Sequence, residues 1–203
     1  MKFSDVFTSA QNEVLADLHR RDRQERRDGI REALSLKALD PSVAQLLYLL
    51  ILQNGAKTIV EFGTSHGYST IHLAAAADRT NGHVYSVEAI AEKRAFAARN
   101  LDAAGLRHRV TLATADGVDF VESLPPGIGF VLVDYDVPQF APAFASLRER
   151  MAPGCSIFFD GGPDGYWERE EVRSFRKVLD DDPCFVASVV PMHKEQLIVV
   201  RIV

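Results

Sequence analysis

Short apolar runs that are typical of buried strands alternate with longer segments of helical periodicity along most of this chain. The predicted strands cover residues 57–62, 83–88, 109–113, 130–134 and 156–160. The predicted helices cover residues 40–53, 68–77, 91–104, 116–123, 139–151 and 168–179. Strand and helix alternating this often indicate βαβ units, and therefore a parallel sheet with helices on both faces.

The last two predicted strands, residues 185–190 and 196–202, break this alternation because a short turn and no helix joins them. Two strands joined in this way pair as an antiparallel hairpin. The expected fold is therefore α/β and Rossmann-like, with a seven-stranded, mostly parallel sheet closed by an antiparallel C-terminal hairpin. Dinucleotide-binding domains close in parallel more often, so the hairpin favours a different branch of this fold class.

Residues 1–36 are polar and are predicted to be helical, with six arginines among residues 20–31. We interpret these arginines as a solvated helix face with ion pairs, and a docking surface for an anionic partner or substrate is the alternative. No linker rich in Pro, Gly or Ser follows. The expected organisation is an N-terminal helical extension, residues 1–36, and one domain, residues 37–203.

Charge and hydropathy limit the partners that this chain is expected to bind. A net charge of −5 disfavours a general nucleic-acid binder, because phosphate binding requires a basic face. The first residues lack the apolar core of a signal peptide, and no apolar run is long enough to span a bilayer. We therefore expect a cytoplasmic protein that binds neither nucleic acid nor membrane, and a homodimer stays open.

Acidic residues stand at or just beyond the ends of the predicted strands. Glu88, Asp134 and Asp160 end three of them, Asp116 follows a fourth, and Glu61 lies in the first. Ligands of open α/β sheets bind outside the carboxyl ends of the strands. So much negative charge at one edge indicates a site that handles cations, hydroxyl groups or amines, and Glu88 is well placed to accept hydrogen bonds from a ribose.

The turn after the first strand is rich in glycine. Gly63 and Gly67 allow a tight turn and a close approach of a ligand to the backbone. The spacing is not the G-x-G-x-x-G of dinucleotide-binding folds, because Ser65 takes the place of the middle glycine. The Lys-Ser/Thr pair of a phosphate-binding P-loop is missing too. Both familiar nucleotide signatures therefore fail.

A resemblance accounts for these features together. The segments VEFGTSHGYSTIHLA, GHVYSVEAI, AARNLDAAGL, GFVLVDYD and LRERMAPGCSIFFD resemble the class I S-adenosylmethionine-dependent O-methyltransferases of the catechol and caffeoyl-CoA type. The likeness covers roughly residues 35–203. It implies a class I methyltransferase fold that binds S-adenosyl-L-methionine.

Matching positions carry the family's cofactor contacts onto this chain. The resemblance implies that the first turn surrounds the methionine part of the cofactor, that one acidic residue holds the ribose, and that the next loops lie against the adenine. It implies that Asp134 lies beneath the sulfonium and acts in catalysis. The implied cofactor-binding residues are Glu61, Gly63, Ser65, Gly67, Ser69, Glu88, Ala89, Asp116, Gly117 and Asp134.

Two departures from the family pattern concern a metal and a base. The resemblance implies a divalent cation, Mg²⁺ or another, on Asp134 and Asp160, but Gly161 stands where the family has an asparagine ligand. Val137 stands in place of the lysine near the accepting hydroxyl. Metal-bound and metal-free sites both stay open. Lys194 falls in the turn of the closing hairpin, where exposure to solvent is expected.

The expected function is transfer of a methyl group from S-adenosylmethionine to a hydroxyl, and less readily an amine, of a small molecule. A second hypothesis is a cofactor-binding module with this fold but no catalysis. A third is a nucleotide-dependent oxidoreductase. His66 is expected to be an ordinary polar turn residue, with a substrate contact as the alternative. Trp167 either lines an acceptor pocket or anchors its loop.

Overall fold

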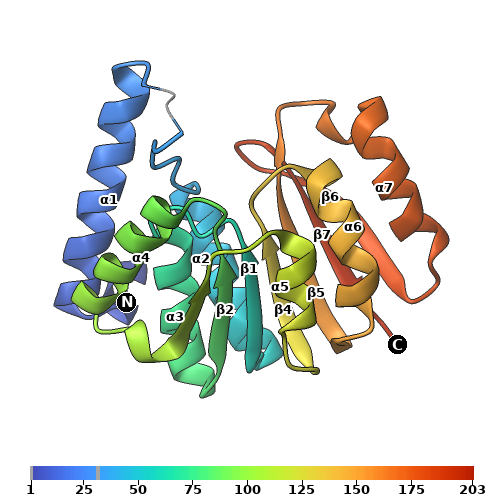
Figure 1. Ribbon diagram of the computed structural model, residues 1–203, viewed down its shortest axis with the longest axis horizontal. Coiled ribbons are helices and arrows are strands. Elements are labelled where there is room, and N and C mark those ends of the chain that lie inside the picture. Colours follow the sequence, from blue (N-terminus) through green and yellow to red (C-terminus); the bar gives the residue numbers. More distant parts are fainter. Residues whose placement is uncertain (1, 31–32) are drawn as a thin grey trace.

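One mixed sheet organises the molecule (Figure 1), whose computed structural model describes residues 2–30 and 33–203. The strand order is β3-β2-β1-β4-β5-β7-β6. The strands are β1 (Thr58–Phe62), β2 (His83–Val87), β3 (Val110–Ala113), β4 (Ile128–Val133), β5 (Met151–Gly162), β6 (Phe185–Pro191) and β7 (Glu195–Arg201). Strands β1 to β5 are parallel, and β7 pairs antiparallel with β5 and β6. The predicted architecture, including the closing hairpin, is confirmed.

Helices cover both faces of the sheet. The α-helices are α1 (Ser9–Arg27), α2 (Pro41–Asn54), α3 (Tyr68–Thr80), α4 (Ala91–Ala103), α5 (Gly117–Glu122), α6 (Val137–Arg148) and α7 (Glu170–Asp181). Short 3-10 turns are η1 (Phe3–Val6), η2 (Arg107–Arg109) and η3 (Tyr166–Glu168). Helices α1 to α4 share one apolar core, and α5 to α7 share the other. No helix in the described ranges is both long and apolar enough to cross a membrane.

The local sequence sets the ends of α2. The Asp40 carboxylate accepts a hydrogen bond from the Ser42 N–H at 2.8 Å, and Pro41 is the first helical residue. This is the N-cap and proline arrangement that the sequence predicts. Gly55 ends the helix with a positive φ of 60°. A left-handed residue at this position favours glycine, which lacks a Cβ.

The predicted N-terminal helix is too long. Helix α1 ends at Arg27, and Gly29 turns the chain with a φ of 69°. Residues 31–32 of the predicted helical segment lie outside the described residues, and residues 33–40 follow as an irregular segment. Acidic side chains of α1 hold this segment by its backbone. Glu25 accepts from the Leu36 N–H at 2.7 Å, and Asp22 accepts from the Ala38 N–H at 2.9 Å.

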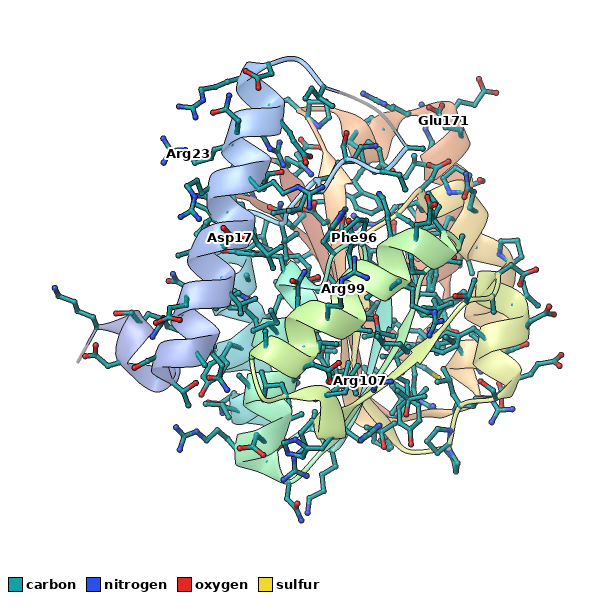
Figure 2. All side chains as sticks on the ribbon, turned by 60° about the vertical axis from the view of Figure 1, so that its left-hand side comes forward. Asp17, Arg23, Phe96, Arg99, Arg107 and Glu171 are labelled. Carbon is teal, nitrogen blue, oxygen red and sulfur yellow. The ribbon has the colours of Figure 1, made fainter. Side chains whose placement is uncertain are left out.

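Arginines of α1 and α4 bind an aromatic side chain between these helices. Figure 2 shows Phe96 and Arg99 close together on α4, in front of the sheet and beside α1. The guanidinium carbons of Arg21 and Arg99 lie 5.5 and 4.7 Å from the centre of the Phe96 ring. A cation over an aromatic face is attracted to it by about 0.5–1 kcal/mol at exposed sites. Part of the arginine-rich segment therefore joins α1 to the domain.

Strand β5 begins earlier than the sequence predicts. The periodicity predicts a helix through Met151, but α6 ends at Arg148 and Met151 already pairs with Ile128 of β4. The strand then runs on to Gly162. Pairing with β4 and with β7 satisfies backbone groups that a longer helix would have to satisfy elsewhere. Tertiary pairing therefore overrides the local helical pattern at this end of α6.

Candidate active site

A cavity of about 550 Å³ opens at the carboxyl ends of β1, β2 and β4. It lies where the strand order reverses, between β1 and β4, which is the usual ligand position in this class of sheet. Its volume falls within the range of about 300–1,000 Å³ that is typical of small-molecule sites. Seven of the residues proposed from the sequence line it: Gly63, Ser65, Glu88, Ala89, Asp116, Gly117 and Asp134.

Gly63 is required by the neighbouring strand. Its φ is 102°, and a Cβ at this position would lie 2.5 Å from the backbone oxygen of Asp134. A contact that short forces the backbone to shift. The backbone N–H of Asp134 in turn donates to the Phe62 oxygen at 2.9 Å. The glycine therefore allows the chain to leave β1 while staying against the end of β4.

Ser65 is tied to two other segments at once. Its backbone N–H donates to Glu88 at 2.8 Å, and its hydroxyl donates to the Leu36 oxygen at 2.6 Å. Its φ of 47° is left-handed and unusual for a residue with a side chain. These bonds stabilise the turn and hold the segment after α1 beside the cavity, where Lys37 joins the lining.

Glu61 and Ser69 lie beneath this turn, and neither is among the cavity-lining residues. The Glu61 side chain is fully buried and accepts hydrogen bonds from the hydroxyls of Ser69, Thr70 and Ser86, each at 2.6 Å. Burial raises the pKa of Glu61, and the three hydroxyl donors oppose that rise. The structure therefore places Glu61 and Ser69 as supports of the turn.

Gly67 is also outside the lining. It caps α3 with a φ of 90°, and a Cβ there would lie 3.3 Å from the Cα of Ala97 on α4. The glycine allows close packing of the α3 N-terminus against α4. A ligand contact, which the sequence suggests for this residue, is not needed to explain it.

Glu88 and Asp116 hold backbone groups and still face the cavity. Both oxygens of Glu88 accept from N–H groups, those of Ser65 at 2.8 Å and of Ile90 at 3.0 Å. Asp116 caps α5 by accepting from Val118 at 2.9 Å and Asp119 at 3.0 Å. A carboxylate has about four acceptor positions, so each retains capacity for a ligand hydroxyl or amine.

Tyr135 is a cavity residue that the sequence reasoning missed. Its ring stacks on Phe62 at 6.0 Å between centroids, and its buried hydroxyl has no hydrogen-bond partner within the described part of the chain. A Cβ on Gly117 would lie 2.6 Å from that hydroxyl oxygen. An unpaired buried hydroxyl is costly, so gaining a hydrogen-bond partner would be favourable for this group. Its place after Asp134 was visible in the sequence, but its direction was not.

A chain of polar groups leads from the cavity to the closing hairpin. Asp134 and Asp160 directly follow Val133 and Phe159, which pair across β4 and β5, so the two aspartates lie side by side at the ends of these strands. The Asp160 side chain is 4% exposed and accepts from Lys194 Nζ at 2.7 Å and from Gln196 Nε2 at 3.0 Å. Loss of solvent raises the pKa of Asp134, the charge of Asp160 adds to the rise, and the Lys194 ammonium opposes it. The Lys194 side chain is 37% exposed, in line with the expected exposure, but the ion pair with the buried Asp160 was not predicted.

The residues around Asp160 do not fit a divalent cation well. A lysine ammonium and an amide N–H already contact the two oxygens of Asp160. Across residues 2–30 and 33–203, no group of three or more His, Cys, Asp or Glu is placed to hold a metal ion. Hard cations such as Mg²⁺ require oxygen ligands, and an ammonium competes with them for the same carboxylate. Asp134 and Asp160 do come together, as the sequence predicts.

The structure corrects the expectation for His66 and decides between the two roles considered for Trp167. His66 is buried rather than an ordinary turn residue, and it stacks on Phe96 at 4.8 Å between centroids. Trp167 is buried, donates from Nε1 to the Glu195 oxygen at 3.1 Å and packs against Phe159. Trp167 therefore anchors its loop, which is one of the two roles considered for it.

The fold is that of a class I methyltransferase, and sequence comparison agrees. Residues 60–161, half of the chain, match the family described as "Methyltransferase domain". The chain belongs to this family. The membership argues against the oxidoreductase hypothesis.

Curated relatives differ in the acceptor that their names state. The catechol O-methyltransferase of Niastella koreensis is 32% identical over 127 residues, which are 61% of this chain and 57% of that protein. The ribosomal RNA small subunit methyltransferase G of Rhodopseudomonas palustris is 32% identical over 152 residues, 74% of this chain and 63% of that protein. This chain thus spans about three fifths of the length of these relatives.

Solved structures share the fold at low sequence identity. An O-methyltransferase from Bacillus cereus in complex with S-adenosylhomocysteine (SAH) superposes with a TM-score of 0.75 at 22% identity, over 93% of this chain and 91% of that one. The O-methyltransferase TomG from Streptomyces achromogenes, in complex with S-adenosylmethionine, superposes with a TM-score of 0.77 at 21% identity, over 97% of this chain and 91% of that one. At identities of 22% and 21%, the likeness shows the fold alone.

Proposed function

We propose that this chain binds S-adenosyl-L-methionine in the cavity and transfers its methyl group to a hydroxyl of a small molecule. The observation that carries the proposal is the convergence of Glu88, Asp116 and Asp134 on one cavity at the switch point of a methyltransferase-family sheet. A bound S-adenosylmethionine supplies a methyl group on a positively charged sulfur. Carboxylates around the cavity favour that charge over a neutral ligand.

The cavity fits this cofactor by position and by hydrogen-bond chemistry. Glu88 has acceptor capacity for ribose hydroxyls, and Asp116 has it for an amino group. Tyr135 lines the same cavity, and its hydroxyl, buried and without a partner among the described residues, lies beside Gly117. The turn from Gly63 to Ser65 forms another part of the wall, which suits the methionine portion.

Asp134 is the residue proposed to act in catalysis. As the acceptor oxygen bonds to the methyl carbon and the carbon–sulfur bond breaks, the hydroxyl proton passes to the Asp134 carboxylate. The raised pKa of Asp134 makes its carboxylate a stronger proton acceptor than an exposed aspartate. The protein otherwise aligns acceptor, methyl carbon and sulfur, and excludes water.

The acceptor is proposed to be a small molecule. Support comes from the net charge of −5, which disfavours binding of a nucleic acid. A cytoplasmic location, no membrane partner and a possible homodimer are part of the same proposal.

Calorimetry and a transfer assay test this function. We expect SAH to bind and NAD not to bind. With methyl-labelled cofactor and a panel of catechols and simple phenols, Asp134→Asn is expected to lower transfer by about 10²–10⁴-fold. The exposed Asp164→Asn is the control. Binding of NAD without binding of SAH would overturn the proposal.

A further inference from the structure

The end of β5 carries a positive charge where the family resemblance implies a metal ion. Lys194 is the last residue of the turn before β7, and Gln196 is the second residue of that strand. Both side chains reach Asp160, one to each carboxylate oxygen, at 2.7 and 3.0 Å. Figure 1 shows the turn between β6 and β7 at the end of the sheet where β5 terminates.

The position next to Asp160 is closed to a further ligand. A Cβ on Gly161 would lie 2.1 Å from the Glu195 backbone oxygen and 3.1 Å from the Trp167 ring. That same oxygen accepts the Trp167 Nε1–H, and Gly162 pairs with Glu195 across the two strands. An asparagine at position 161 would therefore require the hairpin to move. The returning strand that excludes this ligand is also the element that brings in Lys194.

We propose that the Lys194 ammonium takes the place of the divalent cation and holds the acceptor oxygen beside Asp134 without a metal. This inference rests on the function proposed above. An ammonium has three N–H donors, and the bond to Asp160 uses one of them. The lysine side chain is 37% exposed while its carboxylate partner is 4% exposed, so the charge lies at the boundary between solvent and the buried pair.

In the transfer step Lys194 keeps its protons and stabilises negative charge on the acceptor oxygen. The oxygen–carbon bond forms, the carbon–sulfur bond breaks, and the acceptor proton goes to Asp134 as described above. A fixed cation next to a developing oxyanion lowers the energy of the transition state more than that of the bound substrate. Asp160 holds the ammonium in place, and Gln196 in turn holds the other carboxylate oxygen of Asp160.

Binding of Mn²⁺, followed by electron paramagnetic resonance, tests the proposal without any acceptor. The wild-type protein is expected not to bind Mn²⁺ at this site. Lys194→Glu replaces the ammonium by a third carboxylate beside Asp134 and Asp160. This variant is expected to bind Mn²⁺ at least about tenfold more tightly than the wild type, because oxygen ligands set the affinity for such cations.

Lys177→Glu is the matched control, because Lys177 is 73% exposed and pairs with Asp181 on α7 at 2.6 Å, away from the cavity. It is expected to leave Mn²⁺ binding unchanged. Two results would overturn the proposal. One is Mn²⁺ binding by the wild type that Asp160→Asn abolishes. The other is a folded Lys194→Glu variant that binds Mn²⁺ no better than the wild type.

Methyl transfer gives a second readout. Lys194→Met is expected to lower kcat by about 10²–10³-fold, the usual cost of losing one donor to a developing oxyanion, with SAH affinity unchanged. Lys194→Arg is expected to restore part of that loss, and EDTA is expected to leave wild-type activity intact. Activity that EDTA abolishes and Mg²⁺ restores would refute the inference. Failure of the wild type to bind SAH would instead refute the proposed function, and the Mn²⁺ titration would still decide on Lys194.

Discussion

The carboxylate of Glu88 accepts a hydrogen bond from the backbone N–H of Ser65, with a nitrogen–oxygen distance of 2.8 Å. The end of β2 thereby holds the turn that follows β1. Glu88 thus has two roles to separate: support of a left-handed turn residue and binding of the cofactor ribose.

Glu88→Ala is expected to weaken SAH binding by about 1.5–3 kcal/mol, because a charged group that forms several hydrogen bonds is lost. Glu88→Gln keeps a carbonyl oxygen for the Ser65 N–H and is expected to lose less. Calorimetry measures both, with Glu92→Ala in the first turn of α4 as the control. Equal affinity of wild type and a folded Glu88→Ala variant would exclude the ribose role.

Gly63→Ala is expected to destabilise the fold itself. The added Cβ would lie 2.5 Å from the Asp134 backbone oxygen, in a residue with a φ of 102°. Backbone strain and a forced shift together are expected to lower the free energy of unfolding by about 2–4 kcal/mol. Urea denaturation measures this change.

The control for Gly63 is Gly105→Ala, since Gly105 also has a positive φ, of 70°, but no atom within 4 Å of an added Cβ. Its free energy of unfolding is expected to fall by only about 1 kcal/mol, which is the cost of the backbone conformation. If both variants lose the same amount, the contact with Asp134 has no energetic importance.

The sequence predicts the sheet well because each strand is a short apolar run and each helix has its own periodicity. The closing hairpin was predictable for the same reason, since no helix fits between residues 190 and 196. The ends of elements were harder. Pairing between Met151 and Ile128 depends on a neighbour in space, which the periodicity around residue 151 cannot show.

The site was predictable where one residue faces the cavity from a strand end, as Glu88 and Asp134 do. It was not predictable where the role depends on a distant segment. Lys194 lies 34 residues from Asp160 in the chain, and only the antiparallel return of β7 brings them together. The resemblance implies a cofactor contact for Glu61, and the sequence does not show that three hydroxyls from α3 and β2 enclose its carboxylate.

Tyr135→Phe separates folding from binding at the cavity. The wild-type hydroxyl is buried without a partner among residues 2–30 and 33–203, so its removal is expected to leave stability unchanged or raise it by up to about 1 kcal/mol. If the hydroxyl bonds the cofactor, SAH affinity falls by about three- to tenfold. Thermal melting and calorimetry on the same preparations measure the two effects. A loss of stability with unchanged affinity would show that the hydroxyl has a structural role instead.

His72 is expected to make the protein sensitive to mild acid. Its ring is buried in α3 between Phe7 and Tyr68, and Nδ1 lies 3.0 Å from the Tyr68 backbone oxygen. Burial lowers the pKa of His72 from 6.5 to about 4, and the bond to Tyr68 opposes this only in part.

Above about pH 6.5 the histidine is neutral in both the folded and the unfolded chain, so its pKa shift has no effect on stability there. As the pH falls from 6.5 toward 4, the unfolded chain takes up a proton that the folded chain refuses, and the free energy of unfolding declines. A depression of the pKa from 6.5 to about 4 corresponds to a loss of about 3 kcal/mol of stability when the pH reaches 4.

Urea denaturation of wild type and His72→Gln at several pH values isolates this contribution, because the carboxylates titrate in both proteins. The difference in stability between the two is expected to narrow steadily below pH 6.5. His108→Gln, at a side chain that is 62% exposed, is expected to leave the pH dependence of the wild type unchanged. A His72→Gln variant that loses stability in parallel with the wild type down to pH 4 would show that burial of this ring does not limit its protonation.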